Sequence, residues 1–185
     1  MTGNTVMQQA IEIAMNASVD VDADRAVFFS GQKNRREAMR FCREHQDEGF
    51  STLLSTHAHK KLAEIPIFGK KSPFSVEEAV DLTAIASARY AQGVEGEVQV
   101  FSHKVSERSI FYTIELPALL LNESVDFING EDKMTWLNLV QPPILPRTDI
   151  ITPEFLHFDV SDLRHMRHGG RAPNDGPVDT GLDIM

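Results

Sequence analysis

One carboxylate in this 185-residue chain stands in sequence surroundings that suit a functional acid. Glu115 ends the run S-I-F-Y-T-I-E, close to Phe111 and shortly before Pro117. A carboxylate held beside aromatic rings can transfer a proton or stabilise a developing positive charge. A charged residue at the end of a strand is equally typical of contact with solvent. Taken alone, Glu115 leaves both interpretations open.

The histidine and cysteine residues give weaker indications of a functional site than Glu115 does. His57 and His59 would lie on one side of a predicted strand, as two metal ligands can, but the nearby sequence supplies no third ligand, so we expect no metal site. The single cysteine, Cys42, falls on the apolar face of a predicted helix, which favours an inert thiol over a nucleophile. The sequence also lacks a glycine-rich phosphate loop, a G-x-S-x-G nucleophile elbow and an H-E-x-x-H zinc motif.

The elements that must position Glu115 follow from the hydrophobic periodicity. Apolar residues at helical spacing predict helices over residues 5–17 and 76–91, and a third helix that ends at Gly49. Capping-box pairs precede all three helices: Thr5 with Gln8, Asn34 with Glu37, and Ser75 with Glu78. Runs rich in β-branched and aromatic residues predict strands over residues 26–30, 50–55, 98–102, 109–116, 125–128 and 133–140.

This order of elements predicts an α+β fold, with N-terminal helices packed on a small, mostly central β-sheet. From about Gln141 the composition becomes rich in proline and glycine. We therefore expect a single catalytic-type domain over residues 1–140, and a partly disordered C-terminal arm over residues 141–185.

The composition of the chain argues against two classes of binding partner, nucleic acids and membranes. The formal net charge of −9 argues against nucleic acid, which requires clustered lysine and arginine. No apolar run approaches the roughly 18 residues that span a bilayer, and no signal peptide is evident, so we expect no membrane partner and a cytoplasmic protein. The sequence does not indicate an oligomeric state.

Four phrases together resemble a known family. They are F-F-S-G at 28–31, T-L-L at 52–54, A-S-A-R-Y-A-Q-G-V-E-G-E-V-Q-V-F at 86–101, and S-I-F-Y-T-I-E-L-P-A-L at 109–119. In this order they resemble the ADP-ribosyl cyclase and NAD glycohydrolase family, in particular its small bacterial toxin-type members. Those members carry F-W-S-G, T-L-E, A-S-x-x-F-A before a G-x-V-x-V strand, and S-x-F/W-x-x-x-E. The resemblance covers residues 26–128.

The resemblance implies a site and a substrate. It makes Glu115 the catalytic glutamate and NAD(P) the substrate, with no further cofactor. The residues that it assigns to the walls of the nicotinamide pocket are Phe29, Ser30, Ser87, Ser109 and Phe111. Arg108 lies next to Ser109 and is a candidate for binding the pyrophosphate, although a solvent-exposed charge in the turn explains it equally well.

The chain departs from the family pattern at two positions. Leu54 replaces the second acidic residue, which in relatives helps to decide between cyclisation and hydrolysis, and Thr83 replaces a tryptophan. Cleavage of the nicotinamide–ribose bond builds positive charge on the ribose, which a single carboxylate can stabilise. These substitutions therefore favour hydrolysis over cyclisation.

The sequence supports one leading hypothesis and two alternatives. The first is an NAD glycohydrolase that serves as a toxin or effector domain, with an immunity or inhibitor protein as its partner. The second is a mono-ADP-ribosyltransferase, because S-T-L-L-S-T at 51–56 followed by a strand-borne glutamate is similar to that family's pattern. The third is a non-catalytic binding protein on the same fold.

Overall fold

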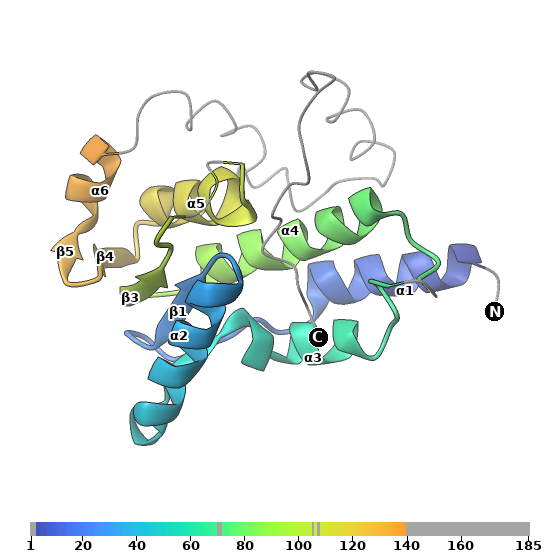
Figure 1. Ribbon diagram of the computed structural model, residues 1–185, viewed down its shortest axis with the longest axis horizontal. Coiled ribbons are helices and arrows are strands. Elements are labelled where there is room, and N and C mark those ends of the chain that lie inside the picture. Colours follow the sequence, from blue (N-terminus) through green and yellow to red (C-terminus); the bar gives the residue numbers. More distant parts are fainter. Residues whose placement is uncertain (1–2, 70–71, 105, 107, 140–185) are drawn as a thin grey trace.

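The computed structural model describes residues 3–69, 72–104, 106 and 108–139 (Figure 1). The α-helices are α1 (Gly3–Asn16), α2 (Gln32–Glu44), α3 (His57–Ala63), α4 (Val76–Gly93), α5 (Leu116–Leu121) and α6 (Lys133–Leu139). Shorter helical turns are η1 (Gln46–Glu48), η2 (Leu53–Ser55) and the π-helical η3 (Phe111–Glu115). The strands are β1 (Ala26–Phe29), β2 (Ser51–Thr52), β3 (Gly96–Phe101), β4 (Val125–Ile128) and β5 (Glu131–Asp132). The predicted arm over 141–185 lies outside the described residues.

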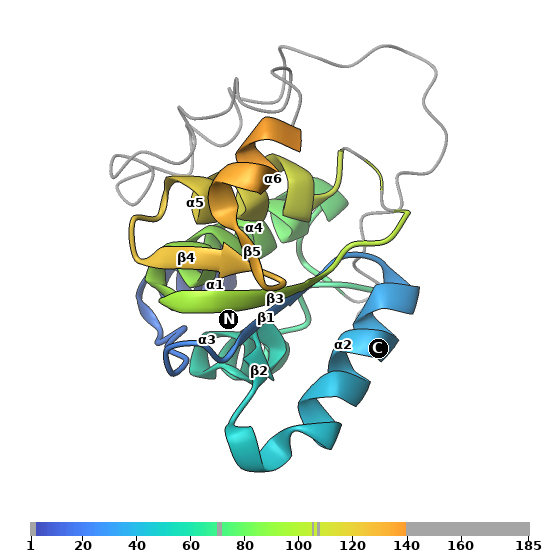
Figure 2. The same cartoon turned by 90° about the vertical axis from the view of Figure 1, so that its left-hand side faces the viewer.

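A single mixed sheet of five strands forms the centre of the fold (Figure 2). Its strand order is β2-β1-β3-β4-β5, and every neighbouring pair is parallel except β4 with β5. In the longest pairing, Ala26 of β1 lies opposite Val98 of β3, and Phe29 lies opposite Phe101. The predicted α+β class with a central sheet is thereby confirmed.

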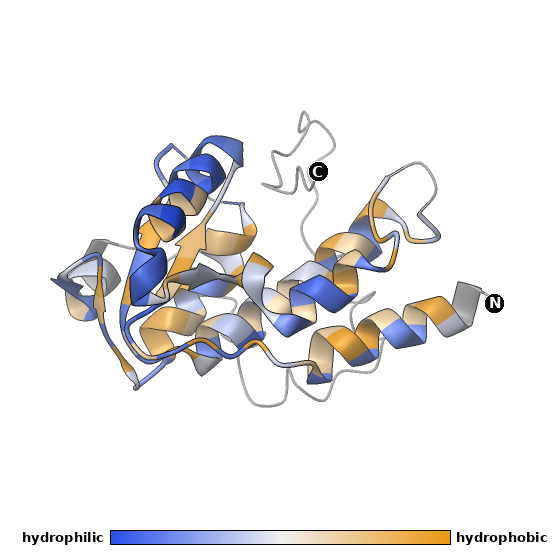
Figure 3. Ribbon diagram, turned by 90° about the horizontal axis from the view of Figure 1, so that it is seen from below, coloured by the Kyte–Doolittle hydropathy of each residue, from blue (hydrophilic) through white to orange (hydrophobic). Residues whose placement is uncertain are grey.

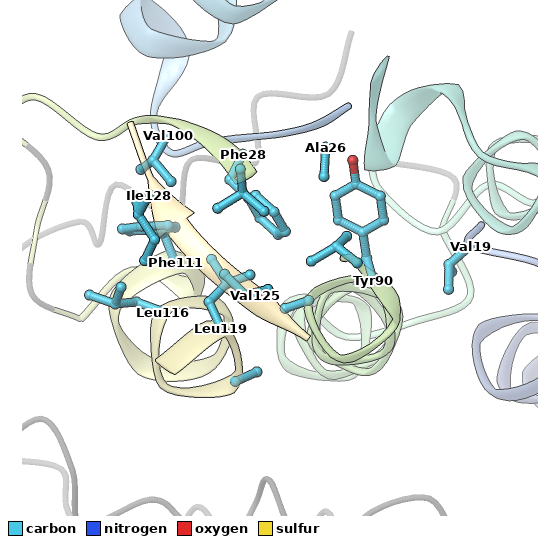
Figure 4. Packing of buried hydrophobic residues seen from close by; sticks show 14 of the residues in the cluster. Val19, Ala26, Phe28, Tyr90, Val100, Phe111, Leu116, Leu119, Val125 and Ile128 are labelled. Carbon is cyan, nitrogen blue, oxygen red and sulfur yellow. The ribbon is translucent and has the colours of Figure 1, made fainter. Parts of the chain in front are cut away.

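The two faces of the sheet are covered by different helices. Phe28, Val100 and Ile128 point toward the side of α4 and α5, where they pack with Leu119 and Tyr90 (Figure 4). On the opposite face, Phe101 packs against Phe41 of α2, with ring centroids 5.7 Å apart. The outward side of α2 is strongly hydrophilic (Figure 3). One face of the sheet is therefore buried under α4 and α5, whereas the other is covered by α2 over β1 and β3 and leaves Phe127 of β4 exposed.

Helix α4 joins the sheet to a second apolar cluster formed with α1 and α3. It begins at the predicted capping box, in which the Glu78 amide donates to Ser75 Oγ at 3.1 Å and the Ser75 amide donates to Glu78 Oε2 at 2.9 Å. Ala79, Leu82 and Ile85 point into the second cluster, whereas Tyr90 points to the sheet. α4 thus fixes the position of the sheet relative to the N-terminal helices.

The strand predicted over residues 109–116 is wrong, because this segment forms η3 and leads directly into α5. Its β-branched and aromatic residues favour a strand, but the apolar run continues to Leu121, and a run of about 12 residues is typical of a buried helix. The Thr113 hydroxyl also stabilises the helical turn by donating to the Ser109 carbonyl at 2.8 Å. Length and tertiary burial override the residue propensities here.

Three smaller expectations also need correction. Residues 133–139 form α6 rather than a strand, and the Met134 amide donates to Asp132 Oδ1 at its start. The strand predicted over 50–55 is only two residues long before η2 begins. Neither Thr5 nor Asn34 caps its helix, because α1 already begins at Gly3 and α2 at Gln32; the Asn34 side chain is buried instead. The predicted strand over 125–128 is confirmed.

None of the helices described here is long and apolar enough to cross a membrane.

Asn122 closes the C-terminal end of α4, and this contact generates a stability prediction. Its Nδ2 group donates to the carbonyls of Ala91, Gln92 and Val94 at 3.1, 3.2 and 2.8 Å. Asn122→Ala leaves these acceptors without their donor, so we expect the free energy of unfolding in urea to fall by about 1–3 kcal/mol. The exposed Asn16, substituted in the same way, should change stability by less than about 0.5 kcal/mol. Equal effects of the two substitutions would contradict this role of Asn122.

Candidate functional site

A pocket of about 650 Å³, its open mouth included, lies at the carboxyl end of β1. The chain leaves β1 for β2 on one side and later returns to β3 on the other side. Ligands of open, largely parallel sheets bind outside the carboxyl end of a strand where the connections diverge in this way. The lining residues are Val27, Phe28, Phe29, Ser30, Arg35, Leu53, Leu54, His59, Thr83, Ser87, Tyr90, Ile110, Phe111 and Glu115.

Glu115 lies at the buried side of this pocket, where only 7% of the residue is exposed. Removal from water raises the pKa of its carboxyl group to about 8, although a hydrogen bond with the Ser87 side chain acts in the opposite direction. Phe111, one helical turn earlier, is also buried and lines the same pocket. At neutral pH the empty pocket therefore holds this acid mainly in its neutral form.

The second wall is the end of β1, where Phe29 and Ser30 precede the sharp turn into α2. Gly31 takes a φ of +80° at this turn, a conformation that a residue with a Cβ rarely adopts. Asn34 Nδ2 donates to the carbonyls of Ser30 and His103, at 2.6 and 3.1 Å. The same side chain thus ties the end of β1 to the loop after β3.

The third wall is one face of α4. Thr83, Ser87 and Tyr90 follow one another at helical spacing and all line the pocket. The Tyr90 hydroxyl donates to the Ser51 carbonyl at 2.8 Å and accepts from the Val27 amide at 3.4 Å. Its ring packs on Phe28 (Figure 4), and the two ring centroids are 4.9 Å apart. Tyr90 therefore holds α4 against β1 and β2 directly beneath the pocket.

Five of the seven predicted site residues line this one pocket: Phe29, Ser30, Ser87, Phe111 and Glu115. The other two do not. Ser109 is buried in the turn before η3, where its hydroxyl accepts from the Tyr112 amide at 3.4 Å. Arg108 is exposed on the preceding turn and is not a lining residue, so the structure does not place it where a pyrophosphate in this pocket would lie.

Sequence reasoning missed two cationic or ionisable side chains in the pocket, Arg35 and His59. His59 was placed on a strand, whereas residues 57–63 form α3, with Thr56 as the N-cap. Burial lowers the pKa of His59, and the nearby Arg35 lowers it further. The only signal for Arg35 was its place in the first turn of a helix that begins directly after β1.

Other ionisable groups lie away from this arrangement. Within the described part of the chain, no group of three His, Cys, Asp or Glu residues is placed to hold a metal ion. His57 does not line the pocket with His59, because two helical residues that are two positions apart point in different directions. Cys42 is half-buried on α2, and burial raises the pKa of its thiol.

Comparison of the chain with family models, with curated proteins and with solved structures finds no match. The chemistry of the site therefore has to be argued from its own geometry.

The arrangement suits a ligand with two unlike ends. Apolar and aromatic side chains form most of the wall, and Glu115 is the only carboxylate among the described residues that line it. The Ser87 hydroxyl can orient that carboxylate, and Arg35 supplies a positive charge to the same pocket, whereas the lowered pKa of His59 favours its neutral form. Such a pocket can bind a flat ring, stabilise one positive centre and hold an anionic group.

The buried carboxyl group predicts a dependence of stability on pH. The pKa of Glu115 is about 8 in the folded state and near 4.5 when exposed, so the folded state holds the extra proton between these values. The free energy of unfolding should therefore fall as pH rises from 4.5 to 8, by up to about 5 kcal/mol. In Glu115→Gln this loss should be absent, which urea titrations at pH 5, 7 and 9 can measure.

Glu123→Gln, at an exposed position on the loop before β4, is the matched control and should keep the pH dependence of the unsubstituted protein. Identical pH profiles for Glu115→Gln and the unsubstituted protein would show that Glu115 is not the titrating group.

Proposed function

We propose that the protein is an NAD(P) glycohydrolase that cleaves the bond between nicotinamide and ribose. The observation that carries the proposal is a single buried carboxylate, Glu115, that faces an aromatic pocket together with Ser87, Phe29 and Phe111. These are the residues that the sequence resemblance also selects. The resemblance alone supports the narrower suggestion of a toxin or effector that acts in a target cytosol and is restrained by an inhibitor or immunity protein.

The reaction needs little more than this pocket. The bond between ribose C1′ and the pyridinium nitrogen breaks, and nicotinamide leaves as a neutral molecule with the bonding electron pair. The positive charge moves to the ribose, where the Glu115 carboxylate stabilises it. Water then adds to C1′ and releases one proton, which gives ADP-ribose or its 2′-phosphate. Phe29 and Phe111 offer apolar surfaces for the nicotinamide ring and exclude bulk water around it.

The substrate itself favours the reactive form of the acid. The pyridinium ring is positively charged, and a positive charge near a carboxyl group lowers its pKa. The pocket can therefore bind the cationic ring when Glu115 loses its proton, and the neutral product nicotinamide reverses this effect. Protonation in the empty pocket and ionisation in the complex are compatible with one mechanism.

Arg35 and His59 are the side chains that we expect to contact the phosphates. A guanidinium group can donate two parallel hydrogen bonds to phosphate oxygens, which makes Arg35 the stronger candidate. The adenosine part of the substrate would extend out of the pocket through its open mouth. This assignment replaces Arg108, which lies outside the pocket.

An assay of nicotinamide release tests the proposed reaction. The purified protein should release nicotinamide from NAD or NADP, and Glu115→Gln should lower kcat by about 100-fold or more. Because the carboxylate is the active form, kcat/KM should rise tenfold per pH unit below about 8 and level off above it.

The controls separate the alternatives. Glu123→Gln should retain activity, because this residue is exposed and does not line the pocket. Label transferred to an added protein acceptor would instead indicate an ADP-ribosyltransferase. A folded protein that releases no nicotinamide from either dinucleotide overturns the enzymatic proposal and leaves a binding protein.

A matched pair of arginine substitutions tests the phosphate assignment. Arg35→Ala should raise KM by about 10-fold or more, because it removes a charge-assisted contact to the substrate. Arg108→Ala should change KM by less than twofold, since this residue does not line the pocket. Steady-state kinetics on both variants measures the difference, and the opposite result would restore Arg108 as the phosphate ligand.

A further inference from the structure

The segment that carries Glu115 is a π-helical turn. η3 spans Phe111–Glu115, and the Leu116 amide donates to the carbonyl of Phe111, five residues earlier. An α-helix would join residues four apart, so this turn contains one extra residue. Isolated π turns within helices are uncommon and occur frequently at functional sites. The wide turn of η3 therefore needs a physical cause.

Pro117 supplies such a cause. It lies in the first turn of α5, two residues after Glu115. In a continuous α-helix its ring would press against the carbonyl of Thr113, and the hydrogen bond to that carbonyl would be missing because proline has no amide hydrogen. One extra residue in the preceding turn moves the carbonyl away from the ring. A proline at this position thus favours the wider turn.

The start of the segment is fixed independently. The Thr113 amide and the Thr113 hydroxyl both donate to the carbonyl of Ser109, at 3.0 and 2.8 Å. These bonds have the four-residue spacing of an α-helix, so the turn that begins at Ser109 and leads into η3 is regular. The wide turn over Phe111–Glu115 is therefore preceded by a regular turn and followed by the proline ring.

The wide turn determines which side chains share the pocket. Ile110, Phe111 and Glu115 all line it. In an α-helix, at about 100° per residue, Ile110 and Glu115 would point about 140° apart. In a π turn, residues five apart lie nearly above one another. A regular α-helix through this segment would keep Glu115 on the side of Phe111, four residues earlier, but would turn its carboxyl away from Ile110 and change its orientation toward Ser87.

We propose that Pro117 is a positioning residue, which imposes the π turn of η3 and thereby directs the Glu115 carboxyl into the pocket. Pro117 is itself buried and is not a lining residue, so it acts through the backbone and not by contact with a ligand. The kinetic consequence of this proposal rests on the proposed glycohydrolase function. The structural consequence does not, because it concerns only where the carboxyl group lies.

Pro117→Ala tests the proposal, because alanine restores the amide and permits a regular α-helix. The main measurement is the titration of Glu115 by NMR with ¹³C-labelled glutamate, its signal identified by its disappearance in Glu115→Gln. We expect the titration midpoint of Glu115 to move by at least one pH unit toward the ordinary range of a glutamate. The melting temperature should stay the same or rise, since the helix becomes regular, while kcat/KM for NAD falls at least tenfold.

Pro66→Ala is the matched control. Pro66 is exposed on the loop after α3, so its replacement should leave the midpoint of Glu115 and the kinetics unchanged. An unchanged midpoint in Pro117→Ala overturns the proposal, whatever happens to activity. If the unsubstituted protein releases no nicotinamide, the glycohydrolase proposal fails, and the NMR comparison still decides the role of Pro117.

A second substitution keeps the proposal testable if Pro117→Ala does not fold. Pro117→Ser also restores the amide, in a residue with weaker helix propensity, and should shift the Glu115 midpoint in the same direction as alanine does. If neither variant folds, Pro117 is required for folding itself, and its proposed role as a positioning residue is overturned.

Discussion

The Glu115 carboxyl group is buried in a largely apolar pocket, and its removal from water is unfavourable. The other features of the pocket are best understood from this constraint. An ionised carboxylate without solvent is unstable unless partners compensate, so the group retains its proton and its pKa rises to about 8. Among the residues that the structure describes, the Ser87 side chain lowers this pKa by hydrogen bonding. A carboxyl group buried with so little compensation reduces stability at neutral pH. Groups with strongly shifted pKa values are concentrated at functional sites, where the shift serves the chemistry and the loss of stability is tolerated.

The sheet topology explains why the pocket lies where it does. Strand β1 is an inner strand of the sheet. The chain leaves it for β2 through α2, and from β2 it crosses to β3, on the other side of β1, by way of α4. These helices cover opposite faces of the sheet, so the space at the carboxyl end of β1 is left unfilled between them. Phe29 and Ser30 reach this space because they end the strand, and Ser87 reaches it because α4 passes beneath. The backbone geometry alone therefore creates a cavity, and η3 closes it with Glu115.

Much of this arrangement could be predicted from the sequence, but not all of it. The helix over 76–91 was predictable because its capping box and apolar period agree, and Phe29 and Ser30 were placed by the apolar run before Gly31. Glu115 was identified by the phrase around it, although its secondary structure was predicted wrongly. Propensity counts favoured a strand there, whereas the length of the apolar run and Pro117 favour a helix with a wide turn.

Arg35 and His59 could not be predicted, because their role depends on where α2 and α3 meet the pocket and not on any local pattern. A basic residue in a helix that is otherwise rich in arginine carries no signal of its own. His59 lies in α3 beside His57, Lys60 and Lys61, which are also basic or ionisable. The sequence does not indicate which of these four side chains faces the pocket. Tertiary packing decides which of several chemically similar residues lines the pocket. The local sequence does not contain this information, and the three-dimensional structure does.

Leu54, which stands where the resemblance expects an acidic residue, lines the pocket and therefore affects its charge. A second carboxylate close to Glu115 would raise the pKa of one of the two further. With Leu54 in place, the described lining contains no second carboxylate, and the empty pocket carries little negative charge at neutral pH. Arg35 lines the same pocket, and its positive charge would favour an anionic phosphate of the proposed substrate. The cationic ring of that substrate would meet a largely apolar wall with one carboxyl group, an arrangement suited to stabilising a single positive centre.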